Sequence, residues 1–540
     1  MPPASSALRR SSTASPAAGS GALRAWQQRT LAAMESWQSG TFLISAAPGA
    51  GKTRPALEFA RRELARRACD AVVIACPTAP LTRQWARAAH GVGLDLVPDA
   101  ESPRPPAGFH GVVVTYARIA KAARQWAAGA GPRTLVVADE AHHLGEELAW
   151  GDSFNAAFAQ ADRWLFLSGT PFRSDATPIP GVSYDADGLA EPDFAYSYAD
   201  AVRDRICRPV AFVTYDGTLS WRSGEDVIES SFDTVLSARE ASRRYRTAIS
   251  TELPDGLPRI LREADERLRG LRSGGHADAA GLVIAADSTH ARRIAALLRE
   301  ATGRVPVVVL HAEPRAAAKL SAFTHDRAPW IVAVNMVSEG VDIPRLRVGV
   351  YATAAKTPLV FRQIVGRFVR TLPGRPPEPS WLYIPADPVL RHHAAGIEHE
   401  LRAVLRRRGE EVALDELERP DRRETEPSAG LDFEPLLADV APQMTLFGSA
   451  PATAPVAQVL PDDPDPLPAE RPVPAFERRN RLRNERHRLV SEVARRDNSS
   501  HREVNAWVNR SLGVTSVEKA TLDQLERSVE LLVRRLSPRR

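Results

Sequence analysis

The feature that most constrains this chain is a glycine-rich turn, Ser45–Thr53, that directly follows the apolar run Thr41–Ile44. Glycines in such a turn let backbone N–H groups curl around phosphates, Lys52 can reach the β- and γ-phosphates, and the Thr53 hydroxyl can ligate Mg²⁺. The helix expected to begin there adds the positive end of its dipole. Ala46 replaces the first glycine of the strict pattern, but it is small enough for a tight turn. The pattern predicts a phosphate-binding loop built from Pro48, Gly49, Ala50, Gly51, Lys52 and Thr53.

A second motif, Asp139-Glu-Ala-His142, follows another apolar run, Leu135–Ala138. The run predicts a strand that ends at the acidic pair. We expect Asp139 to hold Mg²⁺, and Glu140 to orient and deprotonate an attacking water. The neighbouring histidines suggest zinc as an alternative, but no second pair of ligands accompanies them. The two motifs together predict a site that hydrolyses a nucleoside triphosphate.

Composition limits the class of protein. The chain has 540 residues, a formal net charge of +5, 25% charged residues and 44% hydrophobic ones, as expected of a soluble protein with two to four domains. Three cysteines in such a length make no disulfide framework. No apolar run is long enough to span a membrane, so we expect a cytoplasmic protein without a membrane partner. Only five of the 71 basic residues are lysines, so a lysine at 52 favours a site that needs a compact point charge.

The chain divides by pattern into several regions. Short apolar runs alternate with helical patterns twice, which is typical of βαβ units and parallel sheets. The C-terminal residues form helical patterns with capping boxes at Ser500–Glu503 and Thr521–Gln524. We therefore expect a disordered N-terminus at 1–20, an α/β domain at 21–205, a linker or helical insertion at 206–277, a second α/β domain at 278–395, a helical extension and Pro-rich linker at 396–474, and a helical accessory domain at 475–540.

Over about residues 21–395 the ordered motifs resemble superfamily 2 DEAD/DEAH-box helicases and translocases, in the branch of restriction-enzyme motor subunits (ResIII-like). Leu23-Arg-Ala-Trp-Gln27 is similar to the adenine-reading element of that family. The resemblance implies that Gln27 contacts the adenine edge and that Trp26 supports it. Alternatively, Gln27 caps the first helix.

Three further motifs of the first domain resemble the family. Ala75–Thr78 and Val114–Tyr116 imply contacts to the nucleic-acid backbone from Pro77, Thr78 and Thr115, although each stretch also suits an ordinary turn. Leu167-Ser-Gly-Thr-Pro-Phe-Arg173 matches the coupling motif. The hydroxyls of Ser168 and Thr170 are expected to form hydrogen bonds to the acidic motif and so to link the ATP site to the nucleic-acid contacts.

Two motifs of the second domain complete the resemblance. Val334–Pro344 implies that Gly340 and Asp342 approach the nucleotide, and Ser338 the nucleic-acid backbone. Phe361–Arg370 carries the pattern Q-x-x-G-R-x-x-R, with Gln363 as a coupling residue. Arg367 and Arg370, three residues apart on one helix face, are expected to reach a γ-phosphate from the opposite domain. A solvated basic helix face is the alternative.

The resemblance implies two tandem RecA-like parallel-sheet domains, with ATP and Mg²⁺ between them, and a small C-terminal helical domain. It implies an ATP-dependent DNA helicase or translocase acting on nucleic acid, with DNA favoured over RNA. An RNA helicase is one alternative. A nucleotide-switched motor or scaffold subunit of a restriction or defence complex, with a nuclease or methylase partner, is another. Six arginines between 478 and 488 indicate either an accessory nucleic-acid-binding element or a solvated helix.

Overall fold

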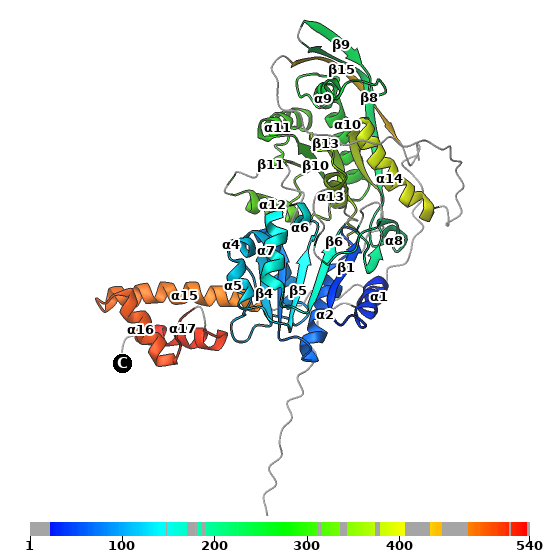
Figure 1. Cartoon of the computed structure of the whole chain (residues 1–540). Helices are drawn as coiled ribbons and strands as arrows, with labels where there is room; N and C mark the ends of the chain where they lie inside the picture. The colour runs from blue at the N-terminus through cyan, green and yellow to red at the C-terminus, as the bar shows by residue number, and fades with distance from the viewer. Residues whose placement is uncertain are drawn as a thin grey trace, which may run out of the picture.

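The computed structural model describes residues 22–146, 148–169, 179, 181–185, 190–223, 225–310, 313, 315–334, 343–372, 378–405, 433–444, 473–517 and 520–536. Two sheets follow one another along the chain, and three helices form a separate projection at the C-terminus (Figure 1). This arrangement confirms the expected fold class of two parallel α/β domains and a helical C-terminal domain. Within the described part, no helix is both long and apolar enough to cross a membrane.

The first sheet has seven parallel strands in the order β3-β4-β2-β5-β6-β1-β7. The apolar runs seen in the sequence form its centre, because strands of a parallel sheet are buried on both faces. Its strands are β1 (Gly40–Ala46), β2 (Ala71–Cys76), β3 (Leu96–Val97), β4 (Gly111–Thr115), β5 (Thr134–Asp139), β6 (Arg163–Ser168) and β7 (Phe194–Tyr196). Its helices are α1 (Ala25–Met34), α2 (Thr53–Ala65), α3 (Ala79–His90), α4 (Tyr116–Lys121), α5 (Ala123–Ala127), α6 (His143–Glu146), α7 (Leu148–Phe158) and α8 (Tyr198–Arg203).

The second sheet has the order β11-β12-β10-β13-β14-β8-β15, and β9 pairs with β8 outside this path. Its strands are β8 (Val210–Ser223), β9 (Asp226–Ser230), β10 (Ala280–Ala285), β11 (Val307–Val309), β12 (Trp330–Val334), β13 (Leu346–Ala352), β14 (Ser380–Pro385) and β15 (Phe433–Met444). Its helices are α9 (Ala238–Ala248), α10 (Leu257–Ser273), α11 (Ser288–Thr302), α12 (Ala316–His325), α13 (Pro358–Phe368) and α14 (Pro388–Leu405). The strands pair in parallel, except that β9 and β15 run antiparallel to β8.

The segment 206–277 is not a linker between domains, because it supplies β8, β9, α9 and α10 to the second sheet. β8 pairs in parallel with β14 through Val210–Tyr215 and antiparallel with β15 through Val213–Ser223. β15 itself lies in the segment 396–474, where the sequence predicts a helical extension and a linker. Val210–Tyr215 has the apolar pattern of a strand, but the outer half of β8 and the whole of β15 are recruited by non-local backbone pairing, which no local pattern reveals. The other domain boundaries stay predictions, and residues 1–20 lie outside the described ones.

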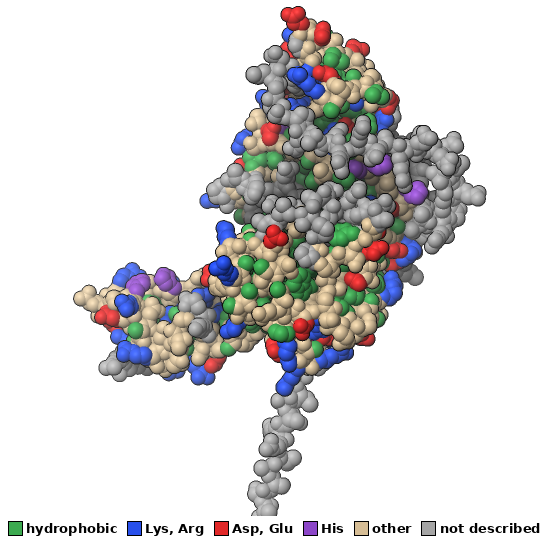
Figure 2. All heavy atoms as spheres, viewed as in Figure 1, with side chains coloured by type: hydrophobic (Ala, Val, Ile, Leu, Met, Phe, Trp, Pro, Cys, Tyr) green, Lys and Arg blue, Asp and Glu red, His purple; other side chains and the backbone are tan. Residues whose placement is uncertain are grey.

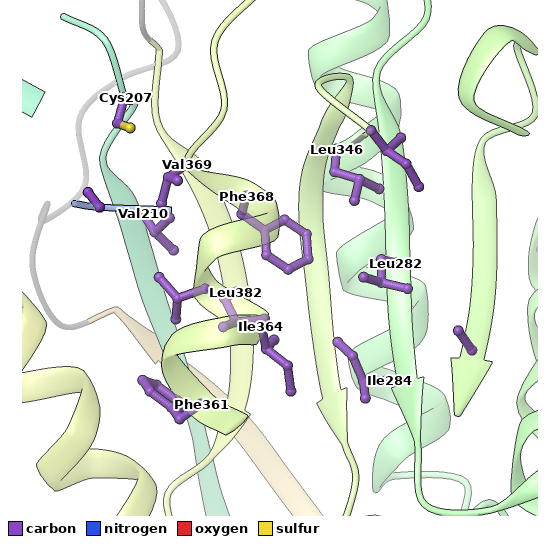
Figure 3. Close-up of a cluster of buried hydrophobic side chains, with 14 of the residues drawn as sticks. Cys207, Val210, Leu282, Ile284, Leu346, Phe361, Ile364, Phe368, Val369 and Leu382 are labelled. Carbon is purple, nitrogen blue, oxygen red and sulfur yellow. The ribbon is translucent and has the colours of Figure 1, made fainter. Parts of the chain in front are cut away.

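Helix α13 is held on the second sheet by its apolar side. It begins with Thr357, whose hydroxyl accepts a hydrogen bond from the Val360 N–H, and Pro358 occupies the first turn. Phe361 and Phe368 are fully buried, and Figure 3 shows them beside Leu382 of β14. The opposite side of α13 is therefore left to face the first domain.

The C-terminal helices are α15 (Ala475–Arg496), α16 (His501–Leu512) and α17 (Leu522–Leu536). Ser500 and Glu503 form the expected capping box of α16, and Gly513 ends this helix with φ +63°. The three helices share a small core of their own, formed by Leu489, Val490, Val493, Ala494, Val504, Val508 and Leu532.

Candidate nucleotide site

The segment predicted to be a phosphate-binding loop lies between β1 and α2. Gly49 and Gly51 have φ values of +80° and +91°, a backbone region that glycine adopts at little cost. Lys52 directly precedes α2, so its side chain starts where the first N–H groups of the helix point out. Positive φ at two glycines, the start of a helix and a lysine together fit a polyphosphate, and residues 45–53 are called the P-loop below.

Lys52 and Glu140 form an ion pair across the site. The Lys52 Nζ lies 2.5 Å from Glu140 Oε1, and the two side chains are 14% and 26% exposed. Burial by itself favours the protonated carboxyl, but the Lys52 ammonium and His142 outweigh it and lower the pKa of Glu140 to about 2. Glu140 also has φ +51°, a region that non-glycine residues rarely adopt and that is often found at functional sites. The ionised carboxylate is thus held beside the lysine.

Asp139 lies deeper, at the carboxyl end of β5. Its Oδ2 accepts a hydrogen bond from Trp85 Nε1 at 2.8 Å, and Tyr116 Oη donates to its backbone carbonyl at 2.7 Å. Burial raises the pKa of Asp139 to about 6, while the nearby Lys52 ammonium acts in the opposite direction. A bound divalent cation would favour the ionised form, and carboxylate and hydroxyl oxygens are the ligands that Mg²⁺ prefers. Asp139 and Thr53 therefore fit the expected magnesium ligands.

Gln27 caps α1 and braces the P-loop. Its Oε1 accepts from the Arg24 N–H at 3.0 Å, and its Nε2 donates to the Gly51 carbonyl at 3.1 Å. The helix-capping alternative is therefore what the structure contains, and Gln27 is only 4% exposed. Trp26 is fully buried and stacks on Tyr196, with ring centroids 4.6 Å apart. Contact of either side chain with adenine stays a prediction.

Helix α13 of the second domain packs directly against the P-loop. A Cβ built on Gly366 would lie 2.6 Å from Cβ of Pro48, closer than real carbon contacts. A Cβ on Gly49 would lie 3.1 Å from Cγ of Arg370. A cavity of ≈ 190 Å³ adjoins this contact and is lined by both domains, for example by Tyr196 and Val369. Residues of the second domain thus reach the phosphate-binding loop.

The two arginines do not share a helix face. Arg367 lies on α13, but this helix ends at Phe368, and Arg370 forms an isolated antiparallel bridge with Cys207. The physical reason is that the Val369 carbonyl accepts from the Arg208 N–H at 2.7 Å, which draws the chain out of the helix. Arg370 is placed by this bridge beside the P-loop.

Two of the residues predicted to be coupling residues, Ser168 and Gln363, lie beside His142. Ser168 Oγ lies 3.5 Å from its Nδ1, and Gln363 Nε2 of α13 lies 3.5 Å from its Nε2. His142 is 4% exposed and lies 3.6 Å from Glu140 Oε2. His142 thus lies beside Glu140 of its own motif, Ser168 of β6 and Gln363 of the second domain.

The residues expected to contact nucleic acid lie at the carboxyl ends of β2 and β4. Pro77 follows β2, Thr78 is the N-cap of α3, and Thr115 is the N-cap of α4, where its hydroxyl accepts from the Arg118 N–H. Their role stays a prediction. Thr170, Ser338, Gly340 and Asp342 lie outside the described residues.

Sequence reasoning missed several residues that shape the site. Arg24 donates from Nη1 to the Ala50 carbonyl at 2.9 Å and so fixes the P-loop from α1. Trp85 orients Asp139, and Cys207 holds Arg370. Arg24 belongs to the same motif as Trp26 and Gln27, Leu23–Gln27, which was the available signal, whereas Trp85 and Cys207 reach the site only through the fold.

Comparisons with known proteins place the chain in a family. Residues 20–173 match the family described as "Type III restriction enzyme, res subunit". The chain is 42% identical over 445 residues to "Uncharacterized protein Rv2917" of Mycobacterium tuberculosis (strain ATCC 25618 / H37Rv), covering 80% of this chain and 73% of that protein. It is 43% identical over 394 residues to "Uncharacterized protein ML1624" of Mycobacterium leprae (strain TN), covering 71% and 65%.

Two solved structures are also similar. One is the type ISP restriction-modification enzyme LlaBIII bound to DNA, with 15% identity, a TM-score of 0.46 and coverage of 71% of this chain and 30% of that one. The other is a fragment of an HsdR subunit of a type I restriction enzyme from Vibrio vulnificus YJ016, with 14% identity, a TM-score of 0.48 and coverage of 70% and 66%. The chain therefore belongs to the family of the mycobacterial protein Rv2917, and its residues 20–173 match the ResIII family.

Proposed function

We propose that this chain is an ATP-dependent DNA helicase or translocase. The observation that carries the proposal is the contact of α13 with the P-loop, where Gly366 meets Pro48 and Arg370 meets Gly49. A phosphate-binding loop that touches a second domain makes a composite site. Ligand contacts on both walls of such a site favour a closed arrangement, and their loss favours an open one. Repeated closing and opening is the basis for movement along a strand.

Each side chain of the site has a definite task in this proposal. ATP with Mg²⁺ supplies the phosphoanhydride bond that is cleaved. The P-loop amides and Lys52 bind the phosphates, and Thr53 and Asp139 offer oxygen ligands for the metal. Glu140 positions the water and accepts its proton. For this, the Lys52–Glu140 ion pair has to part, because Lys52 moves to the phosphates.

The second domain supplies positive charge to the reaction. The backbone bridge between Cys207 and Arg370 holds this arginine beside Gly49, and Arg367 lies one turn away on α13. A guanidinium there stabilises the charge that develops on the transferred phosphoryl group, an effect of about 10³- to 10⁵-fold in turnover. The rate of ATP hydrolysis would then depend on the position of the second domain relative to the P-loop.

Movement requires contacts to nucleic acid in both domains. Pro77, Thr78 and Thr115 follow the carboxyl ends of parallel strands, the edge at which open α/β sheets bind ligands. Contacts from such loops go mainly to phosphate and sugar, so binding should be insensitive to sequence and sensitive to salt. The family description, a restriction-enzyme subunit, favours DNA and also a nuclease or methylase partner.

The ATPase rate of the purified chain tests the proposal. We expect little hydrolysis without nucleic acid, strong stimulation by single-stranded or duplex DNA, and weaker stimulation by RNA. Stimulation by RNA alone would instead identify an RNA helicase. Tight ATP binding without turnover under all three conditions would favour a nucleotide-switched scaffold subunit.

A further inference from the structure

The three C-terminal helices, α15 to α17, form a strongly basic unit that we call the C-terminal arm. Residues 475–540 contain 16 of the 71 Lys and Arg residues but only 9 of the 66 Asp and Glu residues, which is a net charge of +7. The whole chain has a net charge of +5, so the rest of it is slightly acidic. Positive charge is therefore concentrated in the arm, where it creates a local field that attracts polyanions.

The arm is fixed to the first domain at the start of α15. Phe476 is 6% exposed and belongs to the main hydrophobic core. Arg87 Nε of α3 lies 2.7 Å from Glu477 Oε1, and the Arg479 guanidinium lies 5.5 Å from the centre of the Phe109 ring. Figure 1 shows α15 leaving the first domain sideways from this attachment. The arm is thus seated on the first domain through the start of α15.

Several arginines of the basic run have structural partners. Arg478 pairs with Glu526 of α17. Arg486 donates to Asn505 Oδ1 at 2.7 Å and to Asn509 Oδ1 at 3.0 Å, which joins α15 to α16. These side chains hold the arm together, so they do not count as a binding surface.

A different set of arginines forms an exposed row. Arg481, Arg488 and Arg495 follow one another at intervals of seven residues, and all three are exposed. Seven residues are close to two helical turns, so the side chains lie on one face, opposite the buried Val490 and Val493. Arg488 lies 3.7 Å from Glu492 in a pair whose side chains are 67% and 49% exposed, and such pairs are weak. Among the described residues, Arg481 and Arg495 form no ion pair. Figure 2 shows Lys and Arg side chains on the surface of the arm.

We propose that the C-terminal arm binds the sugar–phosphate backbone of nucleic acid through Arg481, Arg488 and Arg495. The row extends over 14 residues, or about 21 Å at ~1.5 Å per residue. This length corresponds to about six base pairs of B-DNA at ~3.4 Å each. Guanidinium groups bind phosphate oxygens in bidentate geometry, which suits a row of arginines better than lysines. Since the arm is seated on the first domain, it adds affinity to a strand that the motor already holds. The inference rests on the proposed function for the choice of nucleic acid as the polyanion.

Binding of the full-length chain to a labelled 20-nucleotide single strand and a 20-base-pair duplex, measured without nucleotide by fluorescence anisotropy, tests the inference. The variant R481Q/R488Q/R495Q keeps good helix formers at exposed sites. It should lower the slope of log Kd against log salt by about 2 to 3, at ~0.7 to 0.9 per lost phosphate contact. Between 50 and 200 mM salt, the affinity of the variant should therefore fall about 20- to 40-fold less than the affinity of wild type falls.

The matched control is R299Q/R304Q/R327Q, which changes the net charge equally. These three exposed arginines lie near the amino ends of β11 and β12, the edge of the second sheet opposite to the ligand-binding edge. The control should keep the wild-type slope. A wild-type slope in the arm variant would overturn the inference and point to an acidic protein partner. An equal loss in both variants would also overturn it, because net charge alone would then explain binding.

The melting temperature checks that the arm stays folded. If the triple variant melts early, each single substitution should still lower the slope by about 0.7 to 0.9, and three unchanged slopes would overturn the inference. The assay contains no ATP, so it separates the two proposals. Binding through the row without any ATP hydrolysis would leave the inference standing and refute the proposed function. ATP hydrolysis by wild type, together with a wild-type slope in the arm variant, would overturn the inference and leave the proposed function standing.

Discussion

A single added methyl group, in Gly366→Ala, should increase the distance between α13 and the P-loop. A Cβ on Gly366 would lie 2.6 Å from Cβ and 3.0 Å from Cγ of Pro48. Ordinary carbon contacts are about 3.5–4.0 Å, so Gly366→Ala has to separate the helix from the loop by about 1 Å. A misplacement of about 1 Å costs on the order of 10²-fold in rate when two catalytic parts must align. We therefore expect the kcat for ATP hydrolysis to fall about 100-fold, with much less change in ATP affinity, because the P-loop itself is intact.

The control for this prediction is Gly396→Ala on α14, where nothing lies within 4 Å of the added Cβ. Both substitutions replace a glycine inside a helix, which favours the helix by about 0.8–1 kcal/mol, so loss of helix stability cannot explain a difference. Steady-state ATP hydrolysis at saturating single-stranded DNA is the assay, with the melting temperature measured beside it. A Gly366→Ala protein that turns over as fast as wild type would refute the reasoning that the two domains share one site.

Lys52→Ala should abolish turnover and weaken ATP binding, because the phosphates lose a nearby ammonium; a nucleotide titration and a phosphate-release assay measure both. Glu140→Gln should keep ATP bound but stop hydrolysis, since an amide cannot take the proton of water, and normal turnover would remove this role. Asp139→Asn should raise the melting temperature of the nucleotide-free chain more at pH 8 than at pH 4. The folded-state pKa of Asp139 is raised from 3.8 to about 6, so wild-type stability falls as pH rises through this window and the asparagine variant avoids that loss. Glu140→Gln should instead lower the melting temperature at pH 8, because its lowered pKa contributes stability above 4.5 that is lost as pH falls. Melting shifts of the same sign in the two variants would contradict these pKa directions.

Much of the fold could be predicted from local pattern, because buried parallel strands appear as continuous apolar runs. The outer half of β8, from Asp216 to Ser223, could not be predicted in this way. Asp216-Gly217 looks like a turn, yet β8 continues through it to Ser223. A Cβ on Gly217 would lie 1.9 Å from the Asp439 carbonyl oxygen, so the glycine permits the close approach of β15. β15 contains Pro435 and Pro442, which argue against a strand when only the sequence is read, but both are tolerated on an edge strand.

In the nucleotide site, too, local sequence patterns do not reveal contacts between residues that are far apart in the chain. The P-loop and the acidic pair are local motifs, and each lies at the end of a strand that the sequence also predicts. The partners of these residues are not local: Lys52 and Glu140 are 88 positions apart, and Trp85 and Asp139 are 54 apart. The helix predicted to carry both arginines ends early, because a backbone bond from Arg208, far earlier in the chain, competes for its last turn. Spacing of three residues indicates one helix face only when the helix continues.

The Arg370→Ala protein shows whether the second domain completes the nucleotide site of the first. The measurement is the steady-state rate of ATP hydrolysis at saturating single-stranded DNA, with the ATP dissociation constant measured in parallel. We expect turnover to fall by about 10³-fold or more, the scale of an arginine that stabilises phosphoryl transfer, while the affinity for ATP stays nearly intact. Wild-type turnover in the Arg370→Ala protein would contradict this expectation.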